Sequence, residues 1–175
     1  NAAVFILLKV FTALLFLFNQ YPVSLIIYKQ LSVPSGLQTI AAQPWSVFSY
    51  MFLHESLMHL VFNMLLLYWT GRIFCEYLYG KRFITTYIFG GLSGAAAFIA
   101  AYNLFPVFDA IYPHAYLMGA SAAVMAITVA LAAYIPDYRV SLLFLGEIRM
   151  KIIAVFLVIL YAIDIPSGNA GGNIA

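Results

Sequence analysis

The stretch FITTYIFGGLSGAAAFIAAYNLF, residues 83–105, contains no charged side chain and decides the class of fold. At about 1.5 Å of rise per residue, a helix of this length crosses the roughly 30 Å hydrocarbon core of a bilayer. Four further stretches are also largely apolar and separated by Pro, Gly or charged residues: Ala2–Asn19, Phe52–Gly71, Tyr116–Ile135 and Met150–Ile165. The sequence therefore predicts an all-α membrane protein, a polytopic bundle with five transmembrane helices.

The composition supports this assignment. The chain has 175 residues, of which 65% are hydrophobic and 8% are charged, whereas soluble domains are about 45–50% apolar and about 25% charged. So few charges exclude a soluble enzyme, and so high a hydrophobicity excludes a disordered chain. A net charge of +2 without a basic cluster argues against a nucleic-acid partner, and the single cysteine, Cys75, excludes an internal disulfide.

Basic residues predict the orientation, because cytoplasmic loops of membrane proteins carry an excess of Lys and Arg. The first connection holds only Lys29, whereas the second and fourth hold six basic residues. This bias places the N-terminus in the cytoplasm and Lys9 in the inner half of the first helix, from which its stem can reach the interface. The six are Arg72, Lys81, Arg82, Arg139, Arg149 and Lys151.

Polar side chains inside a membrane are costly, and those of the second predicted helix are candidates for function. His59 and Asn63 are four residues apart and share one helix face. His54, with Glu55 beside it, lies five residues before His59. That spacing is one residue too long for two imidazoles on one helix to bind the same zinc ion, so we expect no metal.

The fourth predicted helix opens with the small residues Gly119-Ala120-Ser121-Ala122. Counted from the outer face, Ser121 lies roughly 8 Å deep and His59 roughly 10 Å deep, which puts both at one level. A serine among small residues most often serves helix packing, as we expect for Ser93 in residues 90–94. Its matched depth with His59 and Asn63 favours a catalytic role for Ser121.

These motifs, with Trp45 nine residues before His54, resemble the rhomboid intramembrane serine proteases over about the whole chain. The resemblance, to the bacterial type, implies one rhomboid-like domain over residues 1–175, C-terminally incomplete, in which residues 169–175 begin a sixth helix. It implies that Ser121 is the nucleophile and that His59 and Asn63 bind the oxyanion. By the same resemblance, His54 and Gly119 are structural residues near the site.

The family's catalytic base is a histidine on the sixth helix, and the sequence ends at Ala175, where that histidine would be due next. His114, in the loop before the fourth helix, does not easily replace it. Met125 stands where an aromatic often packs beneath the base. We therefore expect the chain to be a piece of a longer protein, inactive by itself.

The expected function is cleavage of single-pass transmembrane proteins near the outer membrane face, without a cofactor, by a multi-pass protein of the bacterial inner membrane. The short fifth helix is a candidate gate for substrate. Two alternatives remain: a non-catalytic rhomboid-like protein that binds membrane helices, and, less favoured, a transporter or channel.

Overall fold

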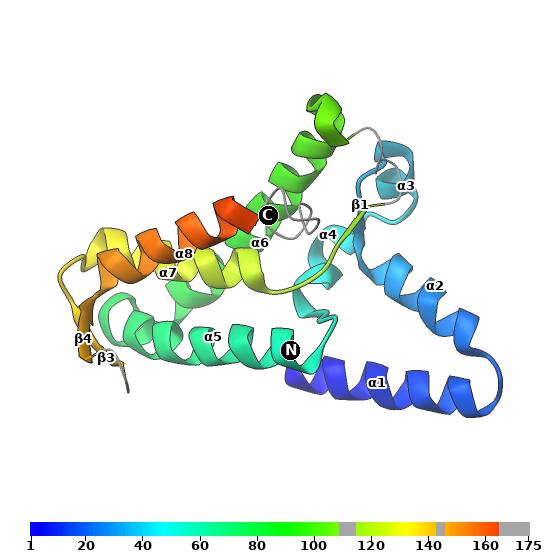
Figure 1. The fold of residues 1–175 in the computed structure, drawn as a ribbon, viewed down its shortest axis with the longest axis horizontal. Helices are drawn as coiled ribbons and strands as arrows, with labels where there is room; N and C mark the ends of the chain where they lie inside the picture. The colour runs from blue at the N-terminus through cyan, green and yellow to red at the C-terminus, as the bar shows by residue number, and fades with distance from the viewer. Residues whose placement is uncertain (109–114, 143–145, 165–175) are drawn as a thin grey trace.

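The fold was taken from a computed structural model, which describes residues 1–108, 115–142 and 146–164 and is built mainly of helices (Figure 1). Within these ranges, two helices are long and apolar enough to span a membrane, α5 (Leu57–Leu78) and α6 (Gly80–Leu104). The helical class is thus confirmed, while the count of five spans stays a prediction. Three shorter apolar helices accompany them, α1 (Ala2–Leu17), α7 (Ser121–Tyr134) and α8 (Met150–Asp164).

The core lies around α7, which packs against α5, α6 and α8 (Figure 1). Ile127 and Leu131 of α7 and Phe98 of α6 are completely buried. Gly90 allows a close approach of α6 to α7, because a Cβ atom there would collide with Ala126. Small residues therefore bring these two helices together, as the glycine-rich sequence around Ser93 predicts.

Helix α5 begins at Leu57 and not near Phe52 as predicted. The preceding residues, Tyr50–Phe52, form a short 3₁₀ helix, η1. Ser56 then caps α5, its hydroxyl accepting a hydrogen bond from the backbone N–H of His59 at 3.2 Å. A serine cap satisfies one of the free N–H groups at a helix start, and this explains why the helix begins here.

The first connection is a folded unit and not a loop. It contains α2 (Tyr21–Leu31), α3 (Leu37–Ala42) and α4 (Ser46–Ser49). The indole of Trp45 donates to the Gln30 carbonyl at 2.9 Å, and the Ser49 hydroxyl donates to the Leu31 carbonyl at 2.7 Å. Side chains from α4 and the turn before it therefore satisfy the carbonyls at the end of α2.

A short strand pair joins this unit to the start of α7. Strand β1 (Val33–Pro34) pairs antiparallel with β2 (Tyr116–Leu117). The prediction that the fourth helix begins near Tyr116 is therefore wrong, because strand pairing and the positive φ of Gly119 (+129°) delay the helix until Ser121.

The fourth connection forms a hairpin of β3 (Arg139–Leu142) and β4 (Gly146–Arg149). It lies beside the junction of α5 and α6 (Figure 1), where the rings of Tyr77 and Tyr138 are 5.7 Å apart. The two basic connections therefore lie at the same end of the molecule, opposite the start of α7. Their cytoplasmic location stays a prediction.

Lys9 is not located where the sequence predicted. Its ammonium group donates to the carbonyl of Glu55 at 3.1 Å, directly before α5, so Lys9 is level with the start of α5 and not with its basic end. The reason is that α1 begins beside the first half of α6, where the Asn1 amide donates to the Tyr87 hydroxyl at 3.2 Å, and then runs past the start of α5 (Figure 1).

Candidate active site

Ser121 is the first residue of α7 and is 8% exposed. No helical turn precedes Ser121, although the predicted depth assumed one; the depth itself stays a prediction. The preceding residue, Ala120, offers no side-chain acceptor to the first turn. The free N–H groups of a helix start, together with the helix dipole, produce a partial positive charge at Ser121, where an oxyanion would be stabilised.

Gly119 lies next to both Ser121 and His59. A Cβ atom on Gly119 would lie 3.1 Å from His59 Nε2 and 3.7 Å from Ser121 Oγ, so both reactive atoms face the same point. The φ of +129° is also one that L side chains rarely adopt. Gly119 is thus required both by its backbone conformation and by the close approach of the imidazole. His59 itself lies in the first turn of α5.

Asn63 lies one helical turn further along α5 and is 7% exposed. Its Nδ2 donates to the backbone carbonyl of His59 at 2.9 Å, a bond within the same helix. An amide nitrogen carries two hydrogens, so this bond leaves one that can be donated elsewhere. Asn63 and His59 thus form one unit on the face of α5 that the spacing predicted.

The ring of His54 packs edge-on against the ring of His59. The two ring centroids are 5.2 Å apart with an interplanar angle of 69°, and His54 is 1% exposed. Neither of its ring nitrogens has a hydrogen-bond partner among the described residues. Burial, followed by the charge of neighbouring His59, lowers the pKa of His54 from 6.5 to about 4, so its ring is neutral at pH 7.

This group contains the kinds of side chain that acyl transfer uses. A hydroxyl, an imidazole, an amide and free helix N–H groups suit attack on a carbonyl and stabilisation of the resulting oxyanion. Nowhere in the described ranges do three or more His, Cys, Asp or Glu side chains gather as a metal site would need. His114 and residues 169–175, considered in the sequence analysis, lie outside the residues that the structure describes.

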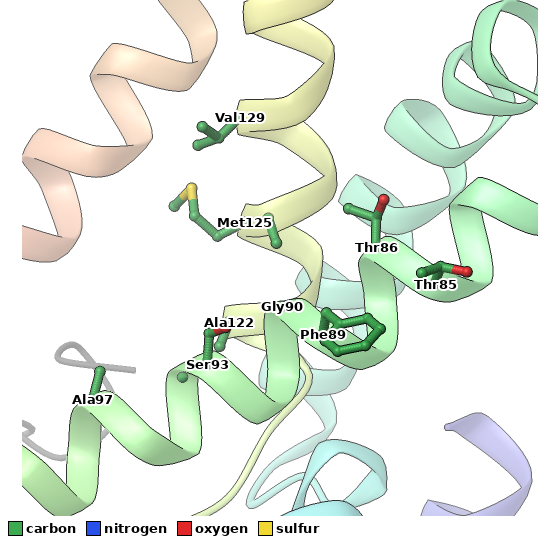
Figure 2. A pocket seen from close by; sticks show the side chains of 11 residues that line it. Thr85, Thr86, Phe89, Gly90, Ser93, Ala97, Ala122, Met125 and Val129 are labelled. Carbon is green, nitrogen blue, oxygen red and sulfur yellow. The ribbon is translucent and has the colours of Figure 1, made fainter.

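An open groove, about 630 Å³ in volume, runs between α6 and α7, and Ala122, the residue after Ser121, is one of its lining residues (Figure 2). Its α7 side starts at Ala122 and continues through Met125. Its other lining residues are mostly small, apart from the aromatic Phe89. They are Thr85, Thr86, Phe89, Gly90, Ser93, Gly94, Ala97, Ala126 and Val129.

One contributor to the site was missed in the sequence. The backbone carbonyl of Tyr50 accepts the N–H of Gly119 at 3.0 Å, which links η1 to the loop before Ser121. A backbone carbonyl has no sequence signature, and Tyr50 belongs to no motif of the second helix. Only the tertiary structure identifies this contact.

Comparison with known proteins gives one match. The family model described as Rhomboid domain matches residues 41–175, which include every candidate site residue. No curated protein and no solved structure matches the chain.

Proposed function

Because the chain belongs to the rhomboid family of integral membrane proteins, we propose that it is a serine endopeptidase that cleaves transmembrane proteins within the bilayer. The observation that carries this proposal is the meeting of His59 and Ser121 over the bare Cα of Gly119. Packing alone does not require a histidine and a serine from two different helices to face one point. Nucleophilic attack with oxyanion stabilisation does require it.

In the proposed reaction, Ser121 Oγ attacks the scissile carbonyl carbon and passes its proton to a general base. The carbonyl oxygen becomes an oxyanion, stabilised by His59, by the Asn63 amide and by the Ser121 N–H. The base then donates the proton to the leaving amine, and water hydrolyses the acyl-enzyme. Loss of one oxyanion donor typically costs about 10²–10³ in kcat.

We expect the base to be a histidine that the family resemblance locates beyond Ala175. The groove between α6 and α7 supports this expectation, because its lining includes Ala122, which follows Ser121, and its many small residues leave room for another helix. Without such a base, the same fold would serve the alternative function, binding of membrane helices without cleavage.

The proposed substrates are single-pass transmembrane proteins, cut near the outer face of a bacterial inner membrane. The location of both basic connections at the end opposite Ser121 is consistent with a cytoplasmic N-terminus. The proposed reaction uses protein side chains, backbone N–H groups and water, and it needs neither a metal nor a cofactor.

The test uses the full-length protein in lipid vesicles with a single-pass model substrate. Ser121→Ala should reduce cleavage to less than about a thousandth of wild type while leaving thermal unfolding nearly unchanged. Ser24→Ala is the matched control, because Ser24 is equally buried but lies in α2. Cleavage by Ser121→Ala would contradict the proposal. A folded wild type that neither cleaves nor reacts with a fluorophosphonate would favour the non-catalytic alternative.

A further inference from the structure

Tyr50 makes two hydrogen bonds, one through its backbone and one through its side chain. Its backbone carbonyl accepts the Gly119 N–H at 3.0 Å, and its hydroxyl donates to the Gly91 carbonyl of α6 at 2.6 Å. The side chain is 1% exposed, so neither bond competes with bulk solvent. One residue therefore joins the loop before Ser121 to the longest helix of the described structure.

The next residue strengthens this attachment. Met51 is completely buried and packs on Gly91, where an added Cβ atom would collide with its sulfur. The Tyr87 hydroxyl of α6 donates to the Met51 carbonyl at 3.2 Å. Thus α6 holds two consecutive residues of η1, by hydroxyl bonds and by close packing.

The contact between η1 and α6 is linked to Ser121 and His59 through Gly119. Gly119 contacts the His59 ring and lies two residues before Ser121. A shift of η1 away from α6 would move the Gly119 N–H, and with it the loop that orients both groups. Displacements of about 1 Å at a catalytic group can cost about 10²-fold in rate.

We propose that Tyr50 is a positioning residue for Ser121, which fixes the backbone of Gly119 against α6. The proposal rests on the proposed function, since positioning matters only if Ser121 reacts. It assigns Tyr50 no contact with substrate. Loss of the Tyr50 hydroxyl should lower kcat and the reactivity of Ser121, while the KM for substrate stays near that of wild type.

The experiment compares Tyr50→Phe with wild type in the full-length protein. It measures the rate at which a fluorophosphonate labels Ser121, hydrogen exchange at the Gly119 amide, and thermal unfolding. We expect labelling to slow about 2- to 10-fold, the size of one net hydrogen bond, and Gly119 exchange to become faster. Thr128→Val is the control, because it also removes a buried hydroxyl, bonded to the Val124 carbonyl within α7.

A second variant approaches the same contact from α6. Gly91→Ala should push Met51 and η1 away and give the same pair of changes. Slower labelling together with faster Gly119 exchange in either folded variant supports the proposal. Wild-type labelling in both variants, or slower labelling with unchanged Gly119 exchange, overturns it. If the wild type is not labelled, the proposed function fails, and with it this role, although faster exchange would still show that Tyr50 holds the loop.

Discussion

Where α7 begins, Leu117 and Ala120 are almost completely buried and the chain is held by backbone hydrogen bonds, including that from Gly119 to Tyr50. Where α7 ends, the chain enters a hairpin whose charged side chains are largely exposed. There Arg139 pairs with Glu147 at 3.2 Å, and Lys151 pairs with Asp137 at 2.7 Å. One helix thus joins a rigid, buried end to a solvated, charged one.

The difference shows where precise geometry is required. Exposed ion pairs contribute little to stability, because water screens them and long side chains lose entropy in forming them. A buried backbone N–H or C=O group has no water to bond to instead, so a small displacement costs the full free energy of its hydrogen bond. We therefore expect substitutions at the first end to affect activity strongly and those at the second end to affect it little.

The largest effect is expected for Gly119→Ala compared with Gly146→Ala. Both glycines have positive φ, +129° and +73°, but only a Cβ at Gly119 would meet another group, the His59 ring at 2.9 Å. Gly119→Ala should lower activity about 10³-fold or more and stability by about 1–3 kcal/mol. Gly146→Ala should retain activity and carry backbone strain alone. Equal activity losses measured for the two variants would break the comparison.

Asn63→Ala should lower kcat about 10²–10³-fold with little change in substrate affinity, because the amide acts once negative charge develops. Thr70→Val is the matched control. It removes the same type of bond within α5, from Thr70 Oγ1 to the Leu66 carbonyl at 2.7 Å, from an equally buried position. Turnover and unfolding measured on the same samples separate the roles. If both variants lose stability alike and stay active per folded molecule, Asn63 does not belong to the site.

The pH dependence of stability should also differ between the two ends. The pKa of His54 falls from 6.5 to about 4 on burial, so the unfolded chain binds the proton more tightly. The contribution of His54 to the free energy of unfolding is complete above pH 6.5 and is lost as the pH falls towards 4. The hydrogen bond and charge of Lys151 lower the pKa of Asp137 below 3.8, so that pair is lost only in stronger acid.

Thermal unfolding of wild type and His54→Gln between pH 7.5 and pH 4 tests this difference. The wild type should lose stability through this range, and His54→Gln should show a flatter profile. Identical profiles would mean that His54 is not buried as a neutral ring.

The smallest effect is expected for Asp137→Asn, which removes the carboxylate bound by Lys151 and Arg149. Unfolding temperature and activity should both stay within error of wild type, because all three side chains are substantially exposed. A large loss of activity from this change would show that the hairpin end controls the site and would contradict the comparison.

Several features could be predicted from local sequence. Uncharged stretches such as residues 83–105 are sufficient to identify a helical membrane protein, because a run of this length fits a spanning helix, which satisfies its backbone hydrogen bonds internally in lipid. The four-residue spacing of His59 and Asn63 puts them on one face, since helix periodicity is a local property. The motifs around Ser121 led to the rhomboid family, which the domain match confirms.

Other features depended on contacts between distant residues, which no local pattern records. The predicted start of the fourth helix was wrong because Tyr116–Leu117 pair with Val33–Pro34, far away in sequence. The level of Lys9 was wrong because α1 is positioned by its contacts with α6 and Glu55, not by a count of residues from the membrane surface. Composition and periodicity thus determined the class of protein and the faces of its helices. Only tertiary packing decided where each helix begins, how deep each side chain lies, and that Tyr50 supports Gly119, because these depend on which backbone groups meet.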